Sequence, residues 1–400
     1  MTPLSLSGNS AAAWAVRLAM VNYIPTFPMT PPIEIIETLA SWIAQGELKS
    51  ELTIQDTENA MFSAAASAAA KGERVFAATS GKNLLQAIEL LYVVSGWRVP
   101  MVLFNVPRMI IAPDGPEPEH NDVLAARDSG FIQIHCATSQ EVLDSILLAY
   151  RLSEDDEVRM PVLINHEGAF LSDPNEIVDI PNSTAAKQFI GTKIQHQPAA
   201  DIHRFSEHCD IFNEPRAGAC FRYAMHLASQ QTLAIYDEVA DEFCDFFGRH
   251  YPAIMSYRCD DADYVFILMG SFTTSAETAI DQLRANGWKV GLLRPRLLRP
   301  FPKDMLVKLL QGKRAVAVLD KHLSPGMGGI LHCEVLCALY GHQNVPAIAA
   351  SFIVSPGVYH INARNFFEMT TILHKAAETG ETPPPRPLLS QQTNGKFTVQ

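Results

Sequence analysis

Short apolar segments alternate with longer segments of helical periodicity through the first half of the chain. The apolar segments fit strands because each is short and flanked by turn residues, and they occupy residues 23–27, 52–55, 74–78, 101–105, 132–136 and 160–165. Apolar positions three and four residues apart indicate helices between them, at residues 10–20, 31–46, 58–71, 82–95 and 139–152. Strands that alternate with helices of this length predict βαβ units and a parallel sheet.

The same alternation returns in the last third of the chain, after a segment that lacks it. From residue 166 to 217 the periodicity fades and prolines are spread through polar sequence, which indicates a linker or a long surface excursion. A helix at 221–247 leads to strands at 264–269, 289–294 and 315–320, with helices at 275–286 and 302–311. We therefore predict an α/β protein with two doubly wound domains, at residues 1–235 (including the linker) and 236–380, followed by a tail at 381–400.

Composition and charge are those of ordinary globular material. The chain has 400 residues, 48% of them apolar, which is enough for two domains with their own cores. The net charge is −12 and the Lys and Arg residues are scattered, so we expect neither nucleic acid nor an anionic membrane as a partner. The start of the chain lacks the basic and apolar regions of a secretory signal, and the Ala-rich segment 61–70 is too short to span a bilayer. These features predict a cytoplasmic protein.

The cysteine pattern argues against a metal or cluster site in this chain. There are seven cysteines, with no CxxC and no compact group of four. Iron–sulfur clusters and structural zinc sites usually show closely spaced ligands. We therefore expect no metal ligands here and interpret the cysteines as small buried apolar residues in a reducing compartment.

Three predicted strand ends carry groups suited to chemistry. The segments that follow these strands are Pro28-Met29-Thr30-Pro31, Asp56-Thr57-Glu58-Asn59 and Asn105-Val106-Pro107-Arg108. In an open α/β sheet the carboxyl ends of the strands converge on one crevice, where ligands bind. A hydroxyl, a carboxylate and a guanidinium would therefore meet in this crevice.

Glu58 and Arg108 each have two interpretations. Glu58 either favours the positive end of a helix capped by Asp56 or Thr57, or enters a cleft where loss of solvent raises its pKa and lets it exchange a proton. Arg108 either binds a substrate carboxylate beside apolar residues, or forms an ion pair with an acid of the following loop. That loop, residues 111–122, is rich in proline and acid and is a candidate lid.

A family resemblance covers nearly the whole chain. Its motifs are Ser7-Gly8-Asn9-Ser10, Phe27-Pro28-Met29-Thr30-Pro31, Asp56-Thr57-Glu58, Ala78-Thr79-Ser80, Asn105-Val106-Pro107-Arg108, Arg127-Asp128-Ser129-Gly130-Phe131, Met269-Gly270-Ser271, Arg299-Pro300-Phe301-Pro302 and Val318-Leu319-Asp320-Lys321. In order and spacing these segments resemble the α subunit of 2-oxoacid:ferredoxin oxidoreductases, most closely the pyruvate type. The resemblance implies a thiamine-diphosphate pyrimidine-binding domain followed by a smaller domain like the C-terminal domain of transketolase.

The resemblance also implies a reaction and a set of partners. The reaction is oxidative decarboxylation of a 2-oxoacid, pyruvate by default, with coenzyme A to an acyl-CoA and CO2. In that family a β subunit binds the diphosphate of thiamine diphosphate through Mg²⁺ and carries a [4Fe-4S] cluster, while γ- and δ-type subunits carry further clusters to ferredoxin or another acceptor. This sequence fits the α role, because it has no Gly-Asp-Gly segment for the diphosphate.

Matching residues imply individual roles. Glu58 matches the glutamate that hydrogen-bonds the aminopyrimidine ring and so favours the tautomer that deprotonates the thiazolium. Arg108 matches the arginine that receives the substrate carboxylate, and Thr30 matches a threonine that bonds the bound 2-oxoacid. Further residues of the matching motifs are expected beside the cofactor: Pro28, Thr79 and Ser80.

Departures from the family pattern bear on the substrate. Met109, Ile110 and Ile111 replace smaller or polar residues, which would suit a bulkier branched or aromatic 2-oxoacid such as phenylglyoxylate. Lys82 stands where the family pattern has a glutamine, and it could bind a second acidic group of the substrate if it faces the site. Two other function classes stay open at this point: a transketolase-like thiamine enzyme without redox centres, and a non-catalytic assembly subunit.

Overall fold

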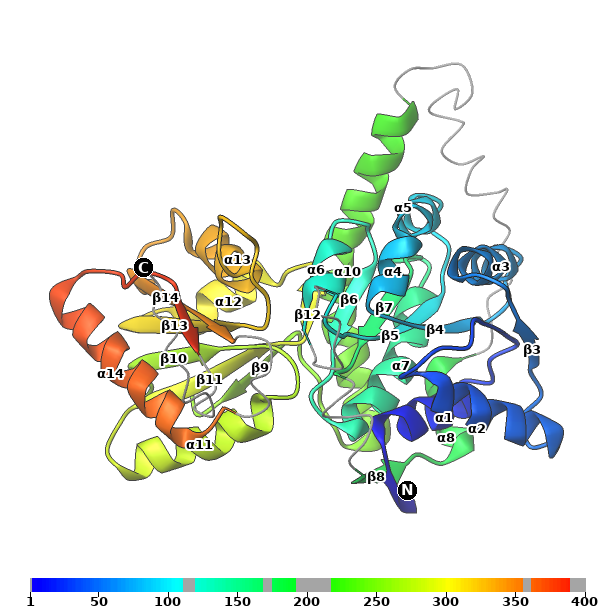
Figure 1. Cartoon of the computed structure of the whole chain (residues 1–400), viewed down its shortest axis with the longest axis horizontal. Helices are drawn as coiled ribbons and strands as arrows, with labels where there is room; N and C mark the ends of the chain where they lie inside the picture. The colour runs from blue at the N-terminus through cyan, green and yellow to red at the C-terminus, as the bar shows by residue number, and fades with distance from the viewer. Residues whose placement is uncertain (1, 111–118, 168–174, 192–216, 355–360, 389–400) are drawn as a thin grey trace.

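The computed structural model describes residues 2–110, 119–167, 175–191, 217–354 and 361–388. These residues form two α/β units that lie side by side, with the long helix α10 (Ala217–Phe247) beside their junction (Figure 1). Among them, no helix has both the length and the apolar character needed to cross a bilayer.

The sheet of the first unit is parallel except at one edge. Its strand order is β12-β6-β7-β5-β4, with β12 antiparallel to β6 and the others parallel. The strands are β4 (Phe76–Ser80), β5 (Val102–Val106), β6 (Ile132–His135), β7 (Val162–Asn165) and β12 (Leu297–Arg299). A parallel pair, β2 (Tyr23–Thr26) and β3 (Glu51–Ile54), extends this sheet through a parallel bridge from Tyr23 to Val75.

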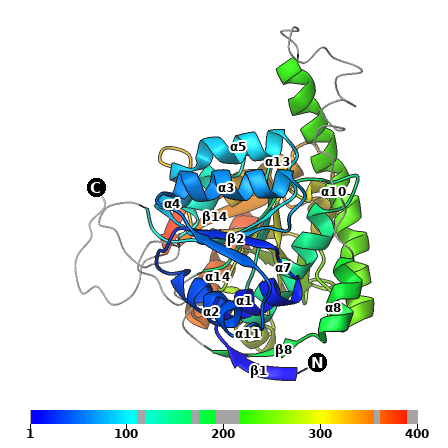
Figure 2. The same ribbon diagram turned by 90° about the vertical axis from the view of Figure 1, so that its right-hand side faces the viewer.

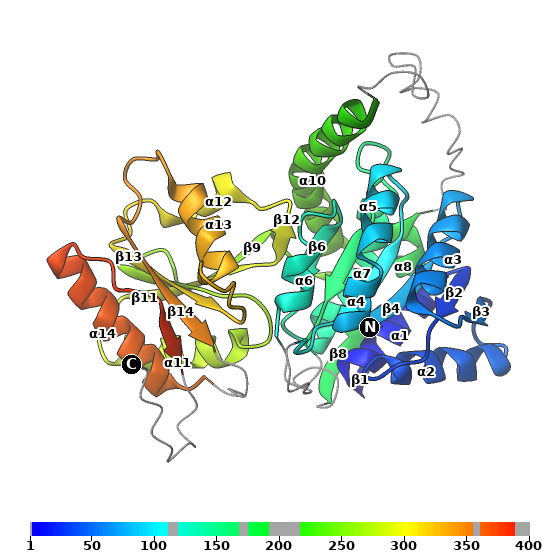
Figure 3. The same cartoon turned by 45° about the horizontal axis from the view of Figure 1, so that its top comes forward.

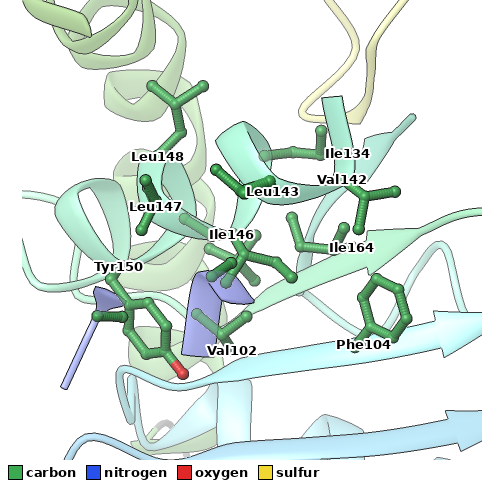
Figure 4. Packing of buried hydrophobic residues seen from close by; sticks show 14 of the residues in the cluster. Val102, Phe104, Ile134, Val142, Leu143, Ile146, Leu147, Leu148, Tyr150 and Ile164 are labelled. Carbon is green, nitrogen blue, oxygen red and sulfur yellow. The ribbon is translucent and has the colours of Figure 1, made fainter. Parts of the chain in front are cut away.

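Helices cover both faces of this sheet, as a doubly wound fold requires. One face packs against α1 (Gly8–Leu18), α7 (Ser139–Ser153) and α10, and the other against α3 (Glu58–Ala70), α4 (Lys82–Gln86) and α5 (Ile88–Gly96). Figure 2 shows α3 and α5 on one side of β2, with α1 and α2 (Ile33–Ala44) on the other. Figure 4 shows side chains of α7, among them Leu143 and Ile146, packed over Val102 and Phe104 of β5.

The second unit repeats this arrangement on a smaller scale. Its sheet has the order β15-β14-β13-β10-β11-β9 and is parallel except for β9. The strands are β9 (Ile254–Tyr257), β10 (Tyr264–Ile267), β11 (Val290–Pro295), β13 (Ala315–Asp320), β14 (Ile348–Val354) and β15 (Arg386–Leu388). Helices α11 (Thr273–Ala285) and α14 (Ala363–Thr379) cover one face, while α12 (Lys303–Leu310) and α13 (Ile330–Leu339) cover the other. The predicted fold class is confirmed.

Several local predictions need correction. The helix expected at 10–20 begins earlier, at Gly8, because the Ser7 side chain caps it by accepting a hydrogen bond from the Ser10 amide. The helix expected at 82–95 is divided at Ala87 into α4 and α5. Within the segment expected to be a linker, β8 (Glu176–Ile180) pairs antiparallel with β1 (Thr2–Leu6), and α8 (Ser183–Ile190) follows it.

Two predicted boundaries, at residues 235 and 381, fall within or just before regular secondary structure. Residue 235 lies inside α10, and side chains beyond it, from Tyr236 to Ala253, pack in the core of the first unit. The segment 381–400 was expected to be a tail, but its residues 386–388 form an edge strand of the second sheet. Residues 389–400 lie outside the described part of the chain.

Buried ion pairs join the two units. Arg294 of β11 donates two hydrogen bonds to Glu141 of α7, at 2.8 and 2.5 Å, and both side chains are buried. Burial raises the pKa of Glu141, but Arg294 and Arg296 outweigh it and hold the pKa below its usual value. Figure 3 shows β12 and α6 (Asn121–Ala125) between the two units. The units therefore meet through paired charges and a shared sheet edge.

Candidate functional site

The loops of the candidate site leave the carboxyl ends of four parallel strands. Strands β2, β3, β4 and β5 all run in the same direction. Their carboxyl ends therefore lie at one edge of the sheet, which is where open α/β sheets bind ligands. The segments that follow them carry Thr30, Glu58, Gly81 and Arg108.

A pocket of about 280 Å³ opens at this edge. It is lined by residues from three of the loops: Met29, Thr30, Ser80, Lys82, Asn83, Arg108 and Met109. Two of these residues are cations and none is acidic, so the pocket suits an anionic ligand. The two methionines give it flexible apolar walls.

The loop that carries Thr30 is held from two sides. The buried Asn9 side chain, in the first turn of α1, donates a hydrogen bond to the Pro31 carbonyl at 3.2 Å and another to Glu34. On the pocket side, the side-chain nitrogen Nδ2 of Asn83 lies 3.6 Å from the sulfur of Met29. Thr30 itself is exposed at the pocket.

Arg108 lies against a bare stretch of backbone. Gly81, between β4 and α4, has φ +52° and ψ −124°, a conformation that suits glycine. A Cβ at this position would lie 2.6 Å from Cγ of Arg108, so only glycine leaves space for the arginine stem. The Ser80 hydroxyl donates to the Val106 carbonyl at 2.8 Å and joins the two strand ends.

Glu58 is buried at the start of α3. The Thr57 hydroxyl caps this helix by accepting from the Ala60 amide at 3.1 Å, so the Glu58 side chain is not needed as a cap. Glu58 is 2% exposed, and Thr79 donates a hydrogen bond to its Oε1. Its Oε2 is buried and has no hydrogen-bond partner within the part of the chain that the structure describes.

Burial changes the acidity of this carboxyl group. Loss of solvent raises the pKa of Glu58 to about 7, although the hydrogen bond from Thr79 acts in the opposite direction. A carboxyl group with a pKa near neutrality can accept or give a proton at physiological pH. Oε2, which has no partner among the described residues, offers the position where a buried ring nitrogen could share that proton.

The structure brings together most of the residues singled out in the sequence. Thr30, Ser80, Lys82, Arg108 and Met109 line the pocket. Thr79, which bonds Glu58, is the neighbour of Ser80 on β4, so the carboxylate and the pocket are served by adjacent residues of one strand.

The remaining candidates lie elsewhere or outside the described residues. Pro28 is exposed and Ile110 is half-buried, and neither lines the pocket. Ile111 lies outside the described residues, as do most of the candidate lid and the acids suggested as ion-pair partners of Arg108. Sequence reasoning missed Met29 and Asn83 as lining residues, although Met29 stands within one of the matching motifs.

The described residues contain no group of three or more side chains suited to a metal ion. Of the cysteines whose side chains are described, Cys136 and Cys259 are buried, as predicted, but Cys337 is exposed on α13. Burial raises the pKa of the Cys136 thiol to about 12, which makes it inert at neutral pH.

Comparison with known proteins identifies the family. Residues 14–242 match the family described as pyruvate flavodoxin/ferredoxin oxidoreductase, thiamine diP-bdg, and residues 262–360 match pyruvate:ferredoxin oxidoreductase core domain II. The chain belongs to this oxidoreductase family. The resemblance found in the sequence motifs is therefore confirmed.

Two relatives illustrate the match along the chain. Pyruvate synthase subunit PorA of Methanothermobacter thermautotrophicus is 36% identical over 84% of this chain and 87% of its own length. Ketoisovalerate oxidoreductase subunit VorA of Pyrococcus horikoshii is 32% identical over 94% of this chain and 95% of its own length. The chain is thus the α subunit of a thiamine diphosphate-dependent 2-oxoacid:ferredoxin oxidoreductase, and neither the transketolase-like nor the assembly-subunit alternative is favoured.

Solved structures show the same fold. The 2-oxoglutarate:ferredoxin oxidoreductase of Magnetococcus marinus superposes with a TM-score of 0.71 at 16% identity, covering 93% of this chain and 65% of that one. A split gene transketolase superposes with a TM-score of 0.52 at 13% identity, covering 94% of this chain and 98% of that one. The fold of both units is therefore shared with known structures.

The raised pKa of Glu58 predicts how stability depends on pH. Its pKa is 4.5 ordinarily and about 7 in the folded chain, so the folded chain keeps a proton that the unfolded chain releases. The resulting stabilisation is complete below about pH 4.5 and is lost as the pH rises through about 7. Urea denaturation should show the wild type losing stability relative to Glu58→Gln over this range. A pH-independent difference between the two would contradict the burial of an ionisable Glu58.

Proposed function

We propose that this chain contributes two things to a hetero-oligomeric oxidoreductase: the carboxylate that holds the aminopyrimidine of thiamine diphosphate, and the pocket that binds the 2-oxoacid. The carboxylate is that of Glu58, and the pocket is the one lined by Thr30 and Arg108. The observation that carries this proposal is the buried Oε2 of Glu58, which has no hydrogen-bond partner among the residues that the structure describes.

The environment of Glu58 fits the aminopyrimidine. A buried polar atom without a partner costs free energy, and a ring nitrogen that carries or shares a proton would supply the missing hydrogen bond. When bound, thiamine diphosphate supplies the carbon nucleophile that attacks the keto group and stabilises the charge left by loss of CO2. Glu58, with a pKa near 7, would hold the proton on the ring nitrogen, while Thr79 keeps its carboxyl group in place.

The pocket fits the 2-oxoacid substrate. The Arg108 guanidinium can bind a carboxylate through two parallel hydrogen bonds, which also fixes the direction in which the keto carbon points. The Thr30 hydroxyl, exposed at the same pocket, can donate a hydrogen bond to an oxygen of the bound acid. Substrate binding and proton exchange are thereby assigned to different loops of one sheet edge.

Pyruvate is the proposed substrate, and Met29 and Met109 set the size of the pocket. These two side chains are the apolar groups among the lining residues, and both are flexible enough to adapt to a small substituent. Lys82 also lines the pocket and lies exposed near its edge, where it can attract an anionic substrate.

The other components belong to partner subunits. This sequence contains no Gly-Asp-Gly segment and no closely spaced group of cysteines. We therefore assign the Mg²⁺-bound diphosphate and a [4Fe-4S] cluster to a β subunit, and further clusters to γ- and δ-type subunits that pass electrons to ferredoxin or another acceptor. Coenzyme A is the proposed acyl acceptor.

The role of Glu58 predicts a loss of turnover on neutralisation. In the assembled enzyme, Glu58→Gln should lower kcat by about 10²-fold or more, the usual contribution of a positioned proton-exchanging group. It should also weaken the binding of thiamine diphosphate. Acyl-CoA formation and calorimetric titration of the cofactor measure the two effects. Asp56→Asn, an exposed acid two residues away, is the matched control. Unchanged turnover and cofactor affinity in Glu58→Gln would refute the role.

The role of Arg108 predicts a defect in substrate binding alone. Arg108→Ala should raise the KM for pyruvate by about tenfold to a hundredfold, the value of a hydrogen-bonded charge pair, without releasing thiamine diphosphate. The KM of Arg108→Lys should lie between those of the wild type and Arg108→Ala, because lysine keeps the charge but loses the paired hydrogen bonds. Steady-state kinetics at saturating coenzyme A test this, and an unchanged KM in Arg108→Ala would reject the assignment.

The apolar wall predicts substrate preference. Met109→Ala should raise kcat/KM for 2-oxoisovalerate relative to pyruvate by about tenfold, since one or two methylene groups in a pocket are worth roughly 1–3 kcal/mol. Both substrates are compared in the same coenzyme A-dependent dye-reduction assay. If the ratio stays at its wild-type value, Met109 does not limit the pocket.

A further inference from the structure

A buried aspartate lies behind the pocket and holds one of its walls. Asp122, in the first turn of α6, is fully buried and accepts three hydrogen bonds. Its Oδ2 accepts from the Gly81 amide and from the Asn105 side chain, each at 3.1 Å, and its Oδ1 accepts from the Val123 amide at 2.7 Å.

Each of these neighbours is a donor, so the position requires an acceptor on both oxygens. A neutral asparagine would turn an NH2 group towards at least one N–H, and a buried donor facing a donor loses its hydrogen bond. Burial raises the pKa of Asp122 to about 7, while the three hydrogen bonds act in the opposite direction. Keeping a carboxylate in the interior therefore costs free energy, and capping the helix alone would not require a buried acid.

The hydrogen bond to Gly81 connects Asp122 with the substrate side of the pocket. Gly81 is the residue against which Arg108 packs: a Cβ there would lie 2.6 Å from Cγ and 3.2 Å from Cδ of the arginine. The turn at Gly81 therefore sets the path of the arginine stem. Fixing the Gly81 amide therefore fixes the backbone surface against which the arginine stem packs.

The segment that carries Asp122 is in turn anchored to the second unit. The His120 amide donates to the Lys321 carbonyl at 3.1 Å, and His120 Nε2 lies 3.0 Å from Oε1 of Glu167. Glu167 also accepts from the Ser271 hydroxyl at 2.5 Å and pairs with Lys321. Burial raises the pKa of Glu167, but Lys321 and His120 outweigh it and keep the carboxylate ionised. These contacts hold the segment from which the Asp122 side chain extends.

We propose that Asp122 is a positioning residue for substrate binding: it fixes the Gly81 turn and, through that turn, the direction of the Arg108 guanidinium. The inference rests on the proposed function of Arg108 in binding the 2-oxoacid carboxylate. Asp122 touches neither substrate nor cofactor, and its effect reaches the reaction through Arg108.

A double-mutant cycle in the assembled enzyme tests this. Asp122→Asn should raise the KM for pyruvate by about tenfold, with kcat at saturating pyruvate and the affinity for thiamine diphosphate changed less than twofold. In the Arg108→Ala background, Asp122→Asn should add no further increase, because the group it positions is gone. An unchanged KM in Asp122→Asn, or the same increase with and without Arg108, would overturn the proposal.

Two variants separate positioning from general destabilisation. Asp320 is a matched control: it is buried, its pKa is also raised to about 7 by burial, and it accepts from the Leu331 and His332 amides. Asp320→Asn should lower stability without changing the KM. Should Asp122→Asn fail to assemble, Asp122→Ser places a small acceptor in the interior but loses the second oxygen, and an unchanged KM there would count against the proposal.

Failure of the proposed function gives a different result. If Arg108→Ala alone leaves the KM unchanged, Arg108 does not bind the substrate carboxylate, and the role of Asp122 is rejected with it. If Arg108→Ala raises the KM but Asp122→Asn does not, the proposed function stands and only the positioning role is lost.

Discussion

The buried carboxyl group of Glu58 is the constraint around which the first unit is built. One oxygen is bonded to Thr79 and the other has no partner among the described residues, although burying a polar group without a hydrogen bond costs roughly 1–3 kcal/mol. The helix it starts is already capped by Thr57, so local structure does not require the acid. This cost fits the proposal that the aminopyrimidine of the cofactor supplies the missing hydrogen bond.

The second unit supports the site without lining the pocket. Its contribution is the buried contact between Glu167 and Lys321, which anchors the segment leading to α6, and the pair formed by Glu141 and Arg294. Charges that are paired and hydrogen-bonded on both sides of a junction restrict rotation of the two units, because separating them would leave a charge buried alone. The segment that leads to α6 is therefore held by contacts from both units.

Periodicity and turn residues were enough to predict the alternating strands and helices, and strand direction then predicted that Thr30, Glu58 and Arg108 would reach one edge. The sequence left two interpretations of Glu58 open, because an acid in the first helical turn is usually exposed. The buried one holds here, and it depends on Thr79, which lies on the next strand. The role of Asp122 was hidden for the same reason: its donors come from Gly81 and Asn105, which are distant in sequence. Strands β1 and β8 were missed because they pair with each other from opposite ends of the first unit's sequence.

The most direct test is a structure of the assembled enzyme with thiamine diphosphate bound. Oε2 of Glu58 should lie within hydrogen-bond distance, about 2.6–3.2 Å, of a nitrogen of the pyrimidine ring. Thr79 should remain bonded to Oε1. A structure in which the cofactor lies elsewhere, or in which the Glu58 carboxyl group turns away from the pyrimidine towards solvent, would contradict the central claim.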